Sequence, residues 1–135
     1  MNVLVDTSVW SLALRRSGGG EQPEASELHS LISDLRVVII GPIRQEILSG
    51  IKSQSQFEQL REVLRSFPDL PLEIGDFERA AEFFNICRRN GIQGSNTDFL
   101  ICAIAEHHDL AIFTTDRDFQ NYLSILPIHL HEMPV

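Results

Sequence analysis

The sequence contains little cysteine, and it lacks long apolar runs. Its two cysteines, Cys87 and Cys102, stand apart in segments of helical character. Two isolated cysteines make neither a disulfide framework nor a metal site, so we expect a protein of the reducing cytoplasm. The apolar stretches fall far short of the ~20 residues that span a membrane. The N-terminus carries no basic leader with a cleavage site, so we expect neither a membrane protein nor a secreted one.

Positive charge is also scarce. The 135 residues include 11 basic and 19 acidic side chains, and the formal net charge is −8. This balance excludes a general nucleic-acid-binding surface. The basic residues are arginines except for Lys52. Because arginine grips phosphate through a planar fork, an acidic protein can still bind RNA through a local arginine rim, although solvated helix faces explain each arginine more simply.

Short apolar runs alternate with helical segments along the chain. The expected strands are residues 2–6, 37–40, 71–74, 111–114 and 128–131. The expected helices are residues 9–16, 23–34, 41–51, 54–67, 76–90 and 98–107, with a loop at 17–20. The helix at 98–107 is apolar nearly all round, which indicates a buried central helix. Strands separated by helices predict a parallel sheet covered on both faces, within one α/β domain of residues 1–135.

Acidic residues stand where the expected strands give way to helices. Asp6 ends the first strand, Asp116 follows a later one, and Glu46 and Asp98 lie in the first turns of helices. In an open parallel sheet these points lie along one edge. Carboxylates that share a pocket repel each other by roughly 4 kcal/mol per pair at 4 Å. A cation is therefore needed, and a hard divalent metal is the usual one.

Each acid also has a simpler explanation when it is taken alone. Asp6 is placed to cap a helix, and Asp98 gains from the dipole of its helix. Glu46 lies at the border of an apolar stripe, and Asp116 and Asp118 suit a turn. The joint pattern favours a functional site, because four separate transitions would each have to place an acid at the same edge by coincidence.

Four segments resemble the motifs of PIN-domain nucleases. They are Asp6-Thr7-Ser8-Val9-Trp10, Pro42-Ile43-Arg44-Gln45-Glu46-Ile47, residues 96–105, and Thr114-Thr115-Asp116-Arg117-Asp118-Phe119. Their order and spacing match over essentially the whole chain, and the length resembles that of the VapC toxins of type II toxin–antitoxin modules. The resemblance implies a three-layer α/β/α sandwich around a central parallel sheet with strand order 3-2-1-4-5.

The resemblance also implies an endoribonuclease that depends on Mg²⁺ or Mn²⁺. The family's catalytic acids correspond to Asp6, Glu46, Asp98 and Asp116. Asp6 and Asp98 would be direct metal ligands. Asp116 would be a ligand or hold a metal-bound water, and Glu46 would act through water or bind a second ion.

Four further residues are implied to support these acids. Thr7, Ser8 and Thr114 would orient ligands through their hydroxyls. Asp118 corresponds to a position that is acidic only in some members of the family. Histidine accompanies none of the acidic motifs, so we expect water to attack the phosphodiester and leave a 5′-phosphate and a 3′-hydroxyl.

The expected partners also come from the resemblance. They are an RNA substrate, either transfer or ribosomal RNA, a cognate antitoxin, and a second copy of the chain in a homodimer. We expect the dimer surface on the helices between Val37 and Phe67. The acidic pocket would attract a basic antitoxin segment, with an arginine or lysine in the place of the metal.

Two other functions are compatible with parts of the pattern. A phosphatase of the haloacid-dehalogenase type also begins with a strand and an aspartate, but it needs a second aspartate where Ser8 stands and a lysine before the late acids. A non-catalytic metal- or RNA-binding module would use the same acids to hold a structural ion. RNA cleavage that needs Mg²⁺ and stops with EDTA distinguishes the enzyme from the module.

Overall fold

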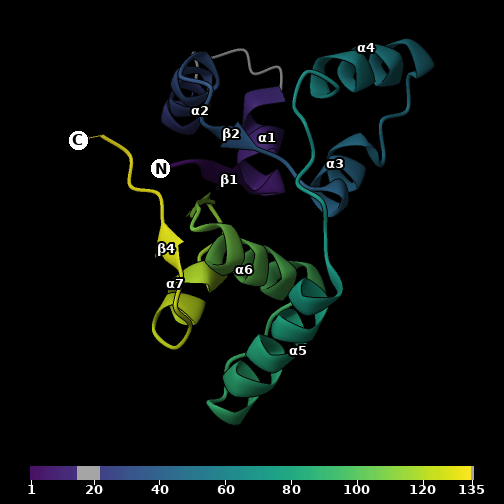
Figure 1. Ribbon diagram of the computed structural model, residues 1–135. Helices are drawn as coiled ribbons and strands as arrows, with labels where there is room; N and C mark the ends of the chain where they lie inside the picture. Colours follow the sequence, from purple (N-terminus) through teal and green to yellow (C-terminus); the bar gives the residue numbers. More distant parts are fainter. Residues whose placement is uncertain (15–21, 135) are drawn as a thin grey trace.

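Four short parallel strands form the centre of the molecule (Figure 1). The computed structural model describes residues 1–14 and 22–134. The strands are β1 (Val3–Val5), β2 (Val37–Val38), β3 (Ala111–Phe113) and β4 (His129–Leu130), in the order β2-β1-β3-β4. The two inner strands β1 and β3 are buried along their whole length, as a sheet covered on both faces requires.

Helices cover both faces of this sheet. They are α1 (Thr7–Leu14), α2 (Pro23–Ser33), α3 (Gly41–Leu48), α4 (Gln54–Leu64), α5 (Ile74–Arg89), α6 (Asn96–His108) and α7 (Asp118–Leu123). The connection from β1 to β2 carries α1 and α2, and the later connections run the opposite way along the sheet, so right-handed crossovers place α1 and α2 on one face and α6 and α7 on the other. In Figure 1, α1 to α4 lie in the upper part of the view and α5 to α7 in the lower part. The α/β sandwich predicted from the sequence is confirmed. No helix in the described residues is long and apolar enough to cross a bilayer.

One element of the expected topology differs from the structure. The prediction of a strand at residues 71–74 is wrong, because α5 begins at Ile74. Where that strand was expected, at the edge of the sheet beyond β2, the described residues form one isolated parallel bridge, between Ile39 and Asp69. Pro71 has no N–H to donate to a ladder. A capping box then starts the helix, in which the backbone N–H of Glu73 donates to Asp76 Oδ2 at 2.9 Å. The loop expected at 17–20 and the end of the first expected helix lie outside the described residues.

Helix α6 lies at the centre of the core, as its apolar sequence predicts. Every residue from Phe99 to Ala105 is buried. It packs against the long helix α5, which ends at Arg89 and is followed by the expected capping glycine, Gly91, with a φ of 75°. The backbone N–H of Ile92 donates to Cys87 O at 2.8 Å and closes this helix end. The buried helix α6 thereby carries Asp98, in its first turn, to the edge of the sheet.

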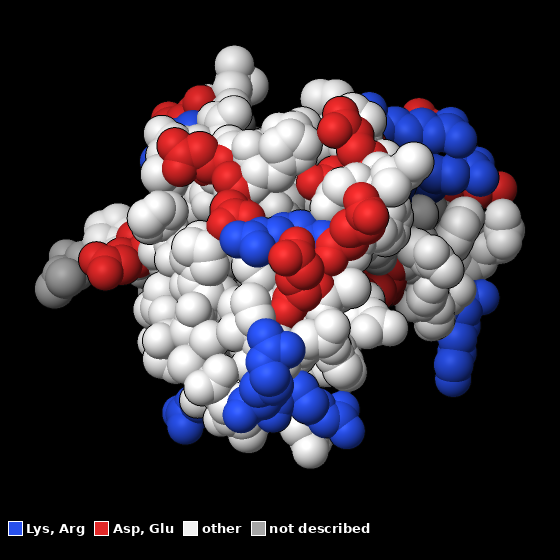
Figure 2. Space-filling view, turned by 60° about the horizontal axis from the view of Figure 1, so that its bottom comes forward, with Lys and Arg blue, Asp and Glu red and all other residues white. Residues whose placement is uncertain are grey.

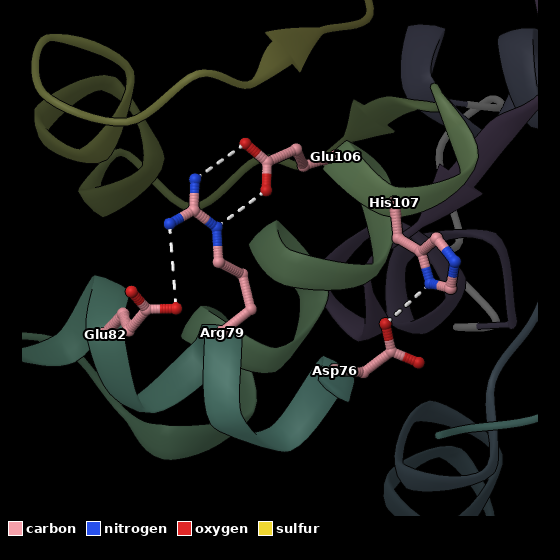
Figure 3. Close-up of polar contacts among 5 residues, drawn as sticks. All are labelled: Asp76, Arg79, Glu82, Glu106 and His107. Atoms are coloured by element: carbon pink, nitrogen blue, oxygen red, sulfur yellow. Dashed lines mark hydrogen bonds and ion pairs between the residues drawn. The ribbon is translucent and has the colours of Figure 1, made fainter. Parts of the chain in front are cut away.

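A polar cluster ties the exposed side of α5 to the far end of α6 (Figure 3). Arg79 donates from Nε to Glu106 Oε1 at 2.8 Å and from Nη2 to Oε2 at 3.0 Å. This bond raises the pKa of Arg79 and lowers the pKa of Glu106. Beside it, the buried carboxylate of Asp76 lies 2.8 Å from His107 Nδ1. On the face that Figure 2 shows, acidic side chains surround the basic side chains at the centre, and a second group of basic side chains lies below them.

The turn after α2 contains a strained residue that offers a stability test. Leu35 has a φ of 58°, and its side chain is 89% exposed. The left-handed conformation costs an L-residue roughly 1–2 kcal/mol, whereas glycine adopts it freely but loses more entropy on folding. We therefore expect Leu35→Gly to raise the free energy of unfolding by about 0.5–1 kcal/mol, as measured by urea denaturation. A lower urea midpoint would contradict this reading of the turn.

Candidate active site

The ends of β1 and β3 and the start of α6 meet at one edge of the sheet. Asp6 follows β1 directly, and its backbone N–H donates to Phe113 O at 2.9 Å, which joins it to the end of β3. Its side chain is only 8% exposed. Asp116 follows β3 by a short turn, and Asp98 lies in the first turn of α6. The sequence predicted this arrangement from the positions of the acids alone.

A hydroxyl network holds the buried carboxylate of Asp6. Its Oδ2 accepts hydrogen bonds from Thr114 Oγ1 at 2.8 Å and from Ser8 Oγ at 2.9 Å. The same two hydroxyls accept from the backbone of the next turn, Thr114 from Asp116 N at 3.0 Å and Ser8 from Thr115 N at 3.1 Å. The position of Asp6 is therefore coupled to the turn that carries Asp116.

Three aspartates form a tight acidic cluster beside this network. One carboxylate oxygen from each of Asp98, Asp116 and Asp118 lies within 4.8 Å of the other two. The turn arranges two of them, because the backbone N–H of Asp118 donates to Asp116 Oδ1 at 2.9 Å. Ligand oxygens on opposite sides of one Mg²⁺ lie up to about 4.2 Å apart, so the cluster is close to the size of one ion's shell. Asp118, expected only as a supporting residue, belongs to this cluster, whereas Asp6 does not.

The environment of Asp98 disfavours a bare negative charge. Burial raises its pKa above the ordinary value for aspartate, and the nearby charges of Asp6 and Asp116 raise it further. Hydrogen bonds from Tyr122 Oη, at 2.7 Å to Oδ2, and from the side chain of Ser95 act in the opposite direction. A cation at the cluster would offset both the cost of burying the Asp98 charge and its repulsion by the neighbouring carboxylates.

Glu46 does not belong to the aspartate cluster and lines a separate hollow of about 440 Å³. Its exposed side chain lines this hollow together with Thr7 and Thr97, the neighbour of Asp98. The Thr7 hydroxyl is buried and has no hydrogen-bond partner among the residues that the structure describes. An unsatisfied buried hydroxyl beside carboxylates is suited to a water or a hydrated ion. Oxygen donors alone line the site, and such a donor set fits Mg²⁺ or Mn²⁺.

The comparisons with known proteins agree with this geometry. A PIN domain family model matches residues 3–123. The chain belongs to the PIN domain family. It is 33% identical over 121 residues to ribonuclease VapC11 of Mycobacterium tuberculosis, with 87% of this chain and 88% of that protein covered. This membership argues against the haloacid-dehalogenase reading of Asp6.

Solved structures of the same fold come from several bacteria. FitAcB from Neisseria gonorrhoeae matches with a TM-score of 0.77 at 21% identity, and the match covers 96% of each chain. A toxin–antitoxin complex from Klebsiella pneumoniae matches with a TM-score of 0.65 at 21% identity, over 87% of this chain and 90% of that chain. At these identities the matches show the fold of a PIN domain.

The hydroxyl network predicts a measurable role for Thr114. We expect Thr114→Val to weaken Mg²⁺ binding by about 10-fold, because a residue that orients a metal ligand typically contributes that much. Valine keeps the shape of threonine but removes the donor to Asp6 and the acceptor for Asp116 N. Isothermal titration with Mg²⁺ measures the change. Thr115→Val is the matched control, since the Thr115 hydroxyl makes no hydrogen bond in the described part of the chain. Equal affinities in the two variants would contradict the coupling.

Proposed function

We propose that this protein is a metal-dependent endoribonuclease and the toxin of a toxin–antitoxin pair. The observation that carries the proposal is the convergence of Asp98, Asp116 and Asp118 beside the buried Asp6, at the carboxyl edge of a PIN-type sheet. The 33% identity to a VapC ribonuclease supports RNA as the substrate class. Toxin–antitoxin complexes among proteins of this fold support the biological role.

The residues at the site have different roles in the proposed phosphodiester hydrolysis. Asp98, Asp116 and Asp118 form the cluster that would hold the ion, with Asp118 in the same turn as Asp116. The buried Asp6 beside them would be a further ligand. A Mg²⁺ or Mn²⁺ ion held there supplies an activated water and neutralises charge on the leaving oxygen. Glu46, which lines the hollow together with Thr7 and Thr97, would orient water or hold a second ion.

The surroundings of the site fit an RNA phosphate and a water nucleophile. Arg117 is exposed and stands between Asp116 and Asp118, where it can grip a backbone phosphate. Two of the histidines are bonded to acids outside the cluster: His107 to Asp76, and His131 to Glu27. The proposal therefore assigns no base to histidine and expects products with a 5′-phosphate and a 3′-hydroxyl.

The nuclease proposal is tested with purified protein and structured RNA. Cleavage is expected with Mg²⁺ or Mn²⁺, with loss after EDTA and full recovery when the metal is restored. The product ends are checked by treatment with an exonuclease that requires a 5′-phosphate. Mg²⁺ binding without any cleavage of transfer or ribosomal RNA would favour the non-catalytic binding module instead.

The partners form a second part of the proposal. An apolar hollow of about 520 Å³ lies between α3, α5 and α6 and reaches Thr97 beside the site. Of its lining residues, only Pro42 lies within the range 37–67 expected for the dimer surface, and the others belong to α5 and α6, among them Phe77, which is 53% exposed. We propose that a second copy packs here and that the basic end of an antitoxin enters the acidic pocket in the cytoplasm.

Two measurements test these partners. Sedimentation at micromolar concentration should give about twice the monomer mass of 15.3 kDa, and a purely monomeric result would refute the dimer. Expression should arrest growth, and co-expression of a small neighbouring gene should relieve it and give a salt-sensitive complex. Without toxicity and without such a gene, the toxin role fails while the nuclease assignment stands on its own test.

A further inference from the structure

A buried phenol reaches the acidic cluster from α7. Tyr122 is fully buried, and its hydroxyl donates to Asp98 Oδ2 at 2.7 Å across 24 residues of sequence. It is the single tyrosine of the chain. The hydrogen bond takes one of the two carboxylate oxygens of Asp98 and leaves the other for an ion.

The ring of Tyr122 is fixed on two sides by other aromatic rings. Phe99, the residue after Asp98, lies with its centroid 5.0 Å away, and Phe119 lies at 5.1 Å with an interplanar angle of 72°. Both of these rings are buried. Because packing sets the ring, the hydroxyl has little freedom to follow the carboxylate. The Tyr122 hydroxyl therefore sets the position of the Asp98 carboxylate, rather than the reverse.

The absence of a side chain at Gly94 leaves the space in which the Tyr122 hydroxyl contacts Asp98. A Cβ at this position would lie 2.2 Å from Tyr122 Oη, 2.8 Å from its Cζ and 2.9 Å from Phe99 Cζ. Such contacts are too short for any side chain, so only glycine leaves room for the hydroxyl here. The φ of Gly94 is not in the left-handed region, so the requirement concerns space and not backbone conformation.

We propose that Tyr122 is a positioning residue for the metal site: its hydroxyl orients Asp98 toward the ion, and Gly94 provides the space for that contact. This inference rests on the proposed metal-dependent function. The alternative is a core tyrosine that merely satisfies its hydroxyl on the nearest carboxylate. Burial, the hydrogen bond to Asp98 and the charge of Asp98 raise the pKa of Tyr122.

Metal affinity distinguishes these two roles. Tyr122→Phe keeps the packed ring and removes only the hydroxyl, and we expect its Mg²⁺ dissociation constant to rise about 10-fold in isothermal titration. Gly94→Ala should cause a similar loss by displacing the phenol. Leu28→Ala is the packing control, because Leu28 is buried on α2 rather than against the Tyr122 ring, and it should lower the melting temperature while its metal affinity stays within about twofold of the parent. Gly75→Ala is the glycine control, because a Cβ there meets nothing within 4 Å.

A spectroscopic measurement adds a readout that packing alone does not change. Protein labelled with ¹³C at the tyrosine Cζ gives one signal, from Tyr122. Saturating Mg²⁺ should shift this signal in the parent protein and leave it unmoved in Asp98→Asn. If the parent binds Mg²⁺ and Tyr122→Phe binds it equally well, the positioning role is overturned while the nuclease proposal stands. If the parent binds no Mg²⁺ or Mn²⁺, the metal site and the positioning role fall together.

Discussion

Asp98→Asn should remove nearly all RNA cleavage and, at neutral pH, make the metal-free protein more stable. The cluster loses a metal ligand, and a ligand that contributes about 3 kcal/mol to the transition state corresponds to about a 100-fold loss of rate. The fold should stay intact, because the amide oxygen of asparagine still accepts the hydrogen bond from Tyr122. The measurements are the single-turnover cleavage rate and the melting temperature in EDTA.

The gain in stability should depend on pH in a defined direction. The pKa of Asp98 is raised in the folded protein, chiefly by burial and then by the charges of Asp6 and Asp116. A group with a raised pKa stabilises the fold below its unfolded pKa, near 3.8, and this contribution is lost as the pH rises through the folded pKa. The melting temperature of metal-free Asp98→Asn should therefore exceed that of the parent at pH 7, and the difference should shrink as the pH falls toward 4.

Asp109→Asn is the matched control for cleavage. It removes one charge at the opposite end of the same helix, and asparagine tolerates the φ of 53° found there. Its cleavage rate should equal that of the parent. If Asp98→Asn lowered the melting temperature and left cleavage unchanged, Asp98 would be a helix-capping residue and the acidic cluster would have no catalytic role.

The elements were predictable from sequence wherever one local force dominates. Buried apolar runs marked β1 and β3, and Pro23 and Pro42 marked the starts of α2 and α3. The expected strand at 71–74 failed because a capping box overrides a weak apolar pattern. Helix α7 was not predicted, because its six residues owe their order to the burial of Phe119 and Tyr122 rather than to a helical period.

The site was predictable only as far as topology determines it. The edge at which the acids gather follows from strand order, so Asp98 and Asp116 could be brought together from sequence alone. The place of Asp118 depends on one backbone hydrogen bond within its turn. The contact of Tyr122 with Asp98 depends on the space left by Gly94, and no sequence period encodes such a contact. In the sequence, only the single tyrosine, Tyr122, and the isolated Gly94 pointed to this contact.

Glu46→Gln should lower the cleavage rate by about 10- to 100-fold while the ion at the aspartate cluster binds almost as before. Glu46 is exposed on α3 and lies outside the cluster of Asp98, Asp116 and Asp118, so we expect it to contribute little to the affinity for the first ion. It lines the same hollow as the unsatisfied hydroxyl of Thr7. A carboxylate there that orients the attacking water acts on the chemical step, for which general acid–base groups typically contribute 10²–10⁴-fold.

Comparing rate with affinity separates the possible roles of Glu46. If it orients water around one ion, Glu46→Gln lowers the rate at saturating Mg²⁺, and titration shows the parent's single binding event. If it holds a second ion, the parent shows two binding events and the variant one, and high Mn²⁺ restores part of the rate. Glu58→Gln removes an equal charge from the exposed side of α4 and should change neither quantity. A Glu46→Gln protein with the parent's rate would make Glu46 an ordinary residue at the border of the apolar stripe of α3.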